Sequence, residues 1–144
     1  MHQSRTLLAA LIFALLFVTG PALAEDAKPN KLVIQVSTDD KRTQTIAMNN
    51  AVNLQKHYGP ENVDIEIVAY GPGLGMLTAK SDHATRVSSL AMQDIRFSAC
   101  QNTMKKVEKK SGKKPVLAEG VGEVPAGVVR IMELQGQGYA YIRP

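Results

Sequence analysis

Short β-branched runs alternate with longer helical segments along this chain, and the alternation restricts the fold more than any other feature of the sequence. The runs predicted as strands are residues 31–37, 63–71, 94–99, 115–122 and 139–143. The segments predicted as helices are residues 38–59, one or two helices within 73–92, then 101–112 and 125–138. Parallel strands need a crossover connection, usually a helix, and such crossovers are right-handed. The sequence therefore predicts an α/β fold with a mostly parallel sheet of about five strands, covered by helices on both faces.

Several small or reactive residues follow the predicted strands directly. They are Ser37-Thr38-Asp39, Gly71-Pro72-Gly73, Cys100 and Gly120-Val121-Gly122. In an open parallel sheet all strands end at one edge, and ligands bind in the loops there. We therefore expect a functional site at this edge, with the thiol of Cys100 in it.

The first 24 residues have the layout of a secretory signal peptide. They begin with the basic start "MHQSR", continue through the apolar "LLAALIFALLFV" and end in Ala22-Leu23-Ala24. The apolar core is about 12 residues long, shorter than the roughly 20 that span a bilayer as a helix, which argues against the alternative of an uncleaved anchor. We expect cleavage after Ala24, a periplasmic or secreted protein without stable membrane insertion, and a single domain over residues 25–144.

Cys100 is the only cysteine of the chain, so no disulfide within one chain is possible. An odd cysteine in an exported protein is buried, paired between chains, or a working thiol. At the start of a predicted helix, backbone N–H groups and the helix dipole favour the thiolate, and Lys105 and Lys106 follow while no acidic residue occurs from Phe97 to Val107. A small hydrophobe packed at the strand end is the alternative, and the spacing leaves both open.

Four stretches resemble one known family. They are "NNAVNL" in the first predicted helix, "VAYGPGLGML" after the second strand, "FSACQNTM" around the cysteine and the ending "LQGQGYAYIRP". In this order and spacing they resemble the DsrE/DsrF-like sulfur-relay family over nearly all of the mature chain. The resemblance implies a three-layer α/β/α fold, assembly into homo-oligomers, and a cysteine that carries sulfane sulfur as a persulfide. The matching position is Cys100.

Other motifs do not indicate a cofactor or a metal. In "GPGLG", residues 71–75, the third glycine comes one residue too early for a dinucleotide-binding loop, and the motif follows the second strand instead of the first. His57 and His83 lack the spacing of a metal site. We expect neither a cofactor nor a metal.

The charge of the chain does not indicate nucleic-acid binding. The net charge is +4, and only 5% of the residues are aromatic, so base stacking has little to build on. Six lysines occur in pairs on and after the third helix: Lys105, Lys106, Lys109, Lys110, Lys113 and Lys114. Such a run is most often a solvated helix face, and it can also attract an anionic partner or membrane surface.

Two functional hypotheses follow. In the first, an exported homo-oligomer carries or senses sulfane sulfur as a persulfide on Cys100, and an unidentified donor or acceptor protein exchanges that sulfur. Its pocket would be formed by Gly71, Gly73 and Gly120, with Asp39 nearby. In the second, the protein is a non-catalytic module that binds a small ligand or a partner, and the cysteine is structural.

Overall fold

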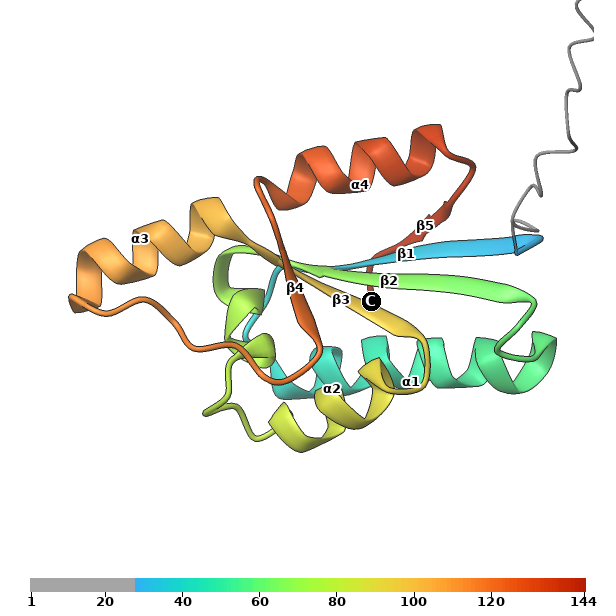
Figure 1. Cartoon of the computed structure of the whole chain (residues 1–144), viewed down its shortest axis with the longest axis horizontal. Coiled ribbons are helices and arrows are strands. Elements are labelled where there is room, and N and C mark those ends of the chain that lie inside the picture. Colours follow the sequence, from blue (N-terminus) through green and yellow to red (C-terminus); the bar gives the residue numbers. More distant parts are fainter. Residues whose placement is uncertain (1–27) are drawn as a thin grey trace, which may run out of the picture.

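Five strands form one parallel sheet in the computed structural model, which describes residues 28–144 (Figure 1). The strands are β1 (Asn30–Val36), β2 (Val63–Ala69), β3 (Ile95–Cys100), β4 (Val121–Val124) and β5 (Ala140–Ile142). Their order across the sheet is β4-β3-β2-β1-β5, and all four neighbouring pairs are parallel. The predicted parallel sheet is confirmed.

Helices cover both faces of this sheet. They are α1 (Lys41–Tyr58), the short 3₁₀ helix η1 (Gly71–Leu77), α2 (Ala84–Ala91), α3 (Gln101–Ser111) and α4 (Gly127–Gly136). In Figure 1, α1 and α2 lie below the sheet and α4 lies above it, whereas α3 extends beyond the edge at which the strands end. The three-layer α/β/α arrangement is therefore confirmed, with α3 outside the layers.

The sheet has a large apolar core on one face and a small one on the other. Ile65 and Ile67 of β2 face α1 and α2 in the large core, because alternate side chains of a strand point to the same face. The small core under α4 contains Val33, Val68, Ile131, Leu134 and Tyr139. A single short helix covers this second face, so it contains fewer apolar contacts.

A buried ionic cluster supplements the small core. Glu66 is only 1% exposed, and its carboxylate accepts hydrogen bonds from the Ser98 hydroxyl at 2.7 Å, from Arg130 at 2.7 and 2.8 Å and from Arg96 at 3.1 Å. Arg96 also forms an ion pair with Asp64 at 2.8 Å. The cluster links β2, β3 and α4.

The structure corrects two predicted boundaries. The fourth strand was predicted at residues 115–122 but comprises Val121–Val124, and the last helix begins at Gly127 instead of Pro125. The apolar residues before β4 bond to the end of η1 instead of to β3: Ala118 N–H donates to the Leu77 carbonyl at 2.9 Å. Leu117 and Ala118 are thus apolar because they pack in the core beside the end of η1, where Leu117 forms an antiparallel bridge with Thr78.

The predicted signal peptide, residues 1–24, lies outside the described residues. Within residues 28–144, no helix has the length and apolar character needed to cross a membrane.

Candidate functional site

Cys100 lies where strand β3 passes directly into helix α3. It is the last residue of β3 and the N-cap of α3, with an extended backbone (φ −73°, ψ 114°). The residue is 5% exposed and its thiol is free. Pairing of Ala99 with β2 and of Cys100 with Val124 of β4 fixes the strand end, so the position of the sulfur is set by the sheet.

The beginnings of two helices supply hydrogen-bond donors to this sulfur. Burial in the protein favours the neutral thiol, but the backbone N–H of Gly127, the Thr103 hydroxyl, and the N–H groups of Thr103 and Asn102 outweigh it and lower the pKa of Cys100 below its usual value. Asn102 and Thr103 belong to the first turn of α3, and Gly127 is the first residue of α4. The first N–H groups of a helix have no partner within the helix and can serve an anion, although the Asn102 N–H also donates to the Pro125 carbonyl at 3.3 Å.

The Thr103 hydroxyl connects this sulfur to the loop after β2. It accepts a hydrogen bond from Gly71 N–H at 3.0 Å, which leaves its own proton to donate to Cys100. The start of α4 also approaches this loop closely, because a Cβ at Gly127 would lie 2.8 Å from Cδ1 of Tyr70. Glycine at position 127 therefore allows the start of α4 to lie against Tyr70.

Sequence reasoning missed Thr103, Gly127 and Tyr70. Thr103 stands three residues after Cys100 within "FSACQNTM", the position from which a side chain in a first helical turn can reach back to the N-cap. Gly127 and Tyr70 carried no comparable signal, since their approach to Cys100 depends on packing between strands that are distant in sequence.

Of the four other predicted pocket residues, only one is linked to Cys100 through hydrogen bonds among the described residues. Gly71 reaches it through Thr103. Gly73 packs under the end of β1, where a Cβ would overlap with the Val36 carbonyl oxygen. Gly120, with φ of +80°, precedes β4 and a Cβ there would lie 2.6 Å from Ala91 Cβ. We expected Gly120 to follow a strand, and this prediction is wrong. Because β4 begins only at Val121, Gly120 lies at the opposite edge of the sheet, where the strands begin.

Asp39 lines a separate cavity of about 280 Å³. It follows β1, which is separated from β3 by β2, and it shares the cavity with Lys41, Gln44 and His83. The structure therefore assigns Asp39 and Cys100 to different parts of the same edge.

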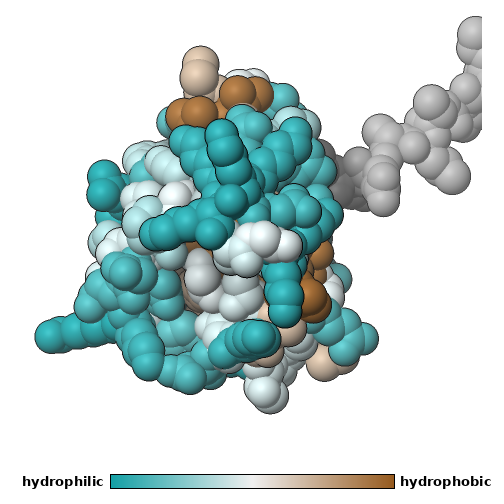
Figure 2. Space-filling model, turned by 90° about the vertical axis from the view of Figure 1, so that its left-hand side faces the viewer, coloured by the Kyte–Doolittle hydropathy of each residue, from teal (hydrophilic) through white to brown (hydrophobic). Residues whose placement is uncertain are grey.

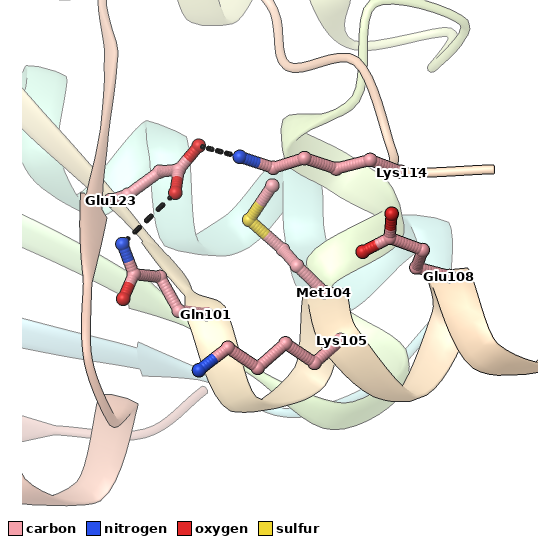
Figure 3. A pocket seen from close by; sticks show the side chains of 6 residues that line it. All are labelled: Gln101, Met104, Lys105, Glu108, Lys114 and Glu123. Carbon is pink, nitrogen blue, oxygen red and sulfur yellow. Dashed lines mark hydrogen bonds and ion pairs between the residues drawn. The ribbon is translucent and has the colours of Figure 1, made fainter.

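A second cavity, of about 200 Å³, begins at the residue after Cys100 (Figure 3). Its lining comprises Gln101, Met104, Lys105, Glu108, Lys114 and Glu123. The Glu123 carboxylate accepts hydrogen bonds from Gln101 and from Lys114, each at 3.0 Å, and these bonds lower its pKa. The cavity is thus a polar hollow between α3 and β4, with the Met104 thioether as its apolar part.

This arrangement is suited to chemistry on an anionic sulfur. Thiolates are the reactive form of cysteine, and N–H donors at helix N-termini stabilise them. Within residues 28–144, no group of three or more His, Cys, Asp or Glu side chains is placed to hold a metal ion.

Comparison with known proteins identifies the family. The family model described as "DsrE/DsrF-like family" matches residues 30–144. The solved structure of a protein of unknown function, MTH1491 from Methanobacterium thermoautotrophicum, is 36% identical and superposes with a TM-score of 0.71, covering 80% of this chain and 99% of that chain. The ychN protein from E. coli has 11% identity and a TM-score of 0.61, covering 80% and 98%, and supports the fold alone. No curated protein matches the sequence.

The family match covers all ten elements of the fold, from β1 to β5, together with the Cys100 site between β3 and α3. It suggests a role of the sulfur-relay type. Because the family model spans residues 30–144 and a solved structure shares 36% identity, the chain belongs to the DsrE/DsrF-like family.

Proposed function

We propose that this protein carries sulfane sulfur as a persulfide on Cys100. The observation that supports this most strongly is the convergence of N–H groups from α3 and α4, with the Thr103 hydroxyl, on a free thiol at a strand end. A persulfide carrier requires a stabilised thiolate and a partner, and it needs no general base of its own.

The proposed reaction conserves atoms and electrons. The Cys100 thiolate attacks the outer sulfur of a donor persulfide, R–S–SH. A sulfur–sulfur bond forms to Cys100, the donor's sulfur–sulfur bond breaks, and the donor leaves as the thiolate R–S⁻. The proton stays on the transferred outer sulfur, so the products are Cys100–S–SH and R–S⁻. Transfer onward to an acceptor thiolate is the same step in reverse.

Burial favours the alternative of a small-ligand-binding or interaction module with a structural cysteine. At 5% exposure, Cys100 resembles the small buried hydrophobe that free cysteine often is. The two functions differ in whether reagents reach the sulfur in the folded protein.

Intact-mass analysis after treatment with inorganic polysulfide distinguishes the two. We expect a mass gain of one sulfur atom that dithiothreitol reverses, and no gain in the Cys100→Ser variant. Alkylation with iodoacetamide should proceed in the native protein. If the native thiol resists both reagents and reacts only after unfolding, the persulfide proposal is wrong and the structural cysteine is correct.

We also propose that the protein is a homo-oligomer that associates through the outer face of α4. Three large apolar side chains are exposed there: Val128, Val129 and Met132, the last being 70% exposed. Figure 2 shows hydrophobic surface gathered at the top of the molecule, over α4. An exposed apolar patch on a soluble domain commonly marks a protein interface.

Light scattering in the presence of reductant tests this assembly. Met132→Glu should shift the protein toward monomer, because it places a charge in the apolar patch. Met92→Glu is the matched control, since Met92 is 81% exposed at the end of α2, away from α4. A wild-type protein that is monomeric at micromolar concentration would contradict the proposal.

Export is a further part of the proposed function. We propose that the mature protein begins at Glu25 and acts in the periplasm or outside the cell, because residues 1–24 have the three-part pattern of a signal peptide.

A further inference from the structure

Helix α3 begins at the proposed sulfur site, and most of its surface is exposed to solvent. Met104 is its only buried residue, and the helix extends away from the sheet (Figure 1). The surface around it that faces the viewer in Figure 2 is largely hydrophilic. Most helices of a globular protein bury a broad apolar stripe, so α3 contributes less to the core than its length would allow.

The outer face of α3 is a concentrated positive surface. At 100° per residue, Lys106, Lys109 and Lys110 lie about 140° to 240° around the helix axis from Met104, on the side opposite the core. Lys105 flanks this face and Lys113 follows the helix. Among the ion pairs of the described residues, none involves these five lysines, whereas Lys114 pairs with Glu123 at 3.0 Å.

Folding stability explains these charges only in part: Lys109 and Lys110 lie in the last turn of α3, where positive charge is favourable, but the spacing of the lysines is not. Lys105 and Lys109, and likewise Lys106 and Lys110, are like charges at i and i+4, an arrangement that destabilises a helix. The five positive charges exceed the net charge of the whole chain, +4, so the rest of the protein is close to neutral. The excess positive charge is therefore concentrated on one projecting helix whose first turn contacts Cys100.

We infer that α3 and Lys113 are a docking surface for a partner protein with an acidic patch, which they bring to Cys100. Complementary charge accelerates association and orients the two proteins. A second copy of this chain is disfavoured here, because its α3 lysines would be repelled and the rest of its chain is close to neutral in net charge. A membrane surface is disfavoured because interfacial helices insert a broad apolar face, and the exposed apolar residue of α3 is Val107 alone. That the docked partner exchanges sulfur with Cys100 rests on the proposed function.

Binding to a defined probe tests the docking surface. The probe is a fluorescein-labelled peptide of alternating glutamate and glycine, measured by fluorescence anisotropy at low and at physiological salt. The variant is Lys106→Gln/Lys109→Gln/Lys110→Gln, which spares Lys105 because that residue lines the cavity of Figure 3. The matched control, Arg42→Gln/Lys56→Gln/Arg143→Gln, removes the same charge from exposed positions elsewhere.

We expect the wild-type protein and Cys100→Ser to bind the peptide alike, and more weakly as the Debye length falls to about 8 Å at physiological salt. The α3 variant should bind about five- to tenfold more weakly, the combined effect of three exposed charge pairs, and the control should bind nearly as wild type. Equal losses in both variants would overturn the inference. So would lysine-dependent binding to vesicles of phosphatidylcholine and phosphatidylserine without binding to the peptide. Circular dichroism melting checks that both variants fold.

Reaction rates test whether the lysines of α3 bring an acidic partner to Cys100. Acidic and neutral peptides, each carrying a cysteine in a mixed disulfide with thionitrobenzoate, are attacked by the Cys100 thiolate. A new sulfur–sulfur bond forms to the peptide and coloured thionitrobenzoate leaves. We expect the acidic peptide to react about five- to tenfold faster in the wild type and only slightly faster in the α3 variant. Equal rates for both peptides in the wild type would overturn the delivery to Cys100. If neither peptide reacts but binding persists, the proposed sulfur chemistry fails and the docking surface stands.

Discussion

Replacing the buried Glu66 with glutamine should destabilise the protein strongly. The side chain is 1% exposed, and its two carboxylate oxygens accept four hydrogen bonds, three of them from the guanidinium groups of Arg96 and Arg130. In Glu66→Gln, the amide nitrogen that replaces Oε2 would face Arg96 Nε and an Arg130 NH₂ group. Donors would then meet donors, and each arginine would lose its buried carboxylate partner, keeping only Asp64 beside Arg96 and the exposed Glu133 beside Arg130.

The size of the effect follows from these contacts. Hydrogen bonds to charged groups contribute about 1.5–3 kcal/mol each, and breaking a buried ion pair by removing one partner costs about 3–5 kcal/mol. Arg96 is partly exposed and can turn toward water, which places the expected loss near the lower end, about 3 kcal/mol. Against a typical free energy of unfolding of about 5–15 kcal/mol, such a loss is large.

Urea denaturation of the wild type, Glu66→Gln and Glu133→Gln provides the assay. Glu133 is the matched control, because it is the other carboxylate beside Arg130, at 3.6 Å, but is mostly exposed. The control should lie within about 1 kcal/mol of the wild type, as exposed ion pairs do. If Glu66→Gln also lies within about 1 kcal/mol, the ionic cluster does not stabilise the fold and the reasoning is refuted.

The stability difference should also depend on pH. Burial raises the pKa of Glu66, but hydrogen bonds from Arg130 and Ser98 and the charges of both arginines outweigh it, so the pKa is lowered overall. A lowered pKa in the folded state contributes stability that is fully present above the unfolded value, about 4.3, and is lost as the pH falls through the folded value. The difference between wild type and Glu66→Gln should therefore be constant near neutral pH and shrink below about pH 4.

Three further predictions concern the site and the N-terminus. Thr103→Val removes a hydroxyl that donates to Cys100, so the pKa of the thiol should rise and the pH profile of its alkylation should move to higher pH. The control Thr85→Val, on the exposed side of α2, should leave this profile unchanged. Gly127→Ala places a Cβ 2.8 Å from Tyr70 and should lower the free energy of unfolding by about 1–3 kcal/mol in thermal or urea denaturation. The control Gly136→Ala, on the same helix, meets nothing within 4 Å and should be neutral or slightly stabilising. N-terminal sequencing of the exported protein should begin at Glu25, and a product that retains residues 1–24 would contradict processing at Ala24.

The sequence by itself determined the order of the elements and the edge at which the thiol lies. Period-two and helical patterns are local, so β1, β2, β3 and α1 were predicted nearly to their ends, and Cys100 was placed between a strand and a helix. Parallel crossovers then required all strand ends to share one edge. The fourth strand was misplaced because the apolar Leu117 and Ala118 pair with the end of η1 and the residue after it instead of with β3.

Only the tertiary structure decided what surrounds the sulfur. Gly71 and Gly127 are separated from Cys100 by 20 or more residues, and they reach its neighbourhood because β2 and β4 flank β3. Whether a residue donates to the sulfur depends on close packing between segments that are distant in sequence, such as that of Gly127 against Tyr70, which no local pattern encodes. Gly120 and Asp39 were also predicted at the site from their sequence positions. In the structure, Gly120 lies at the opposite edge of the sheet and Asp39 lines a separate cavity. Periodicity fixes which residues end a strand, and packing fixes which of them meet.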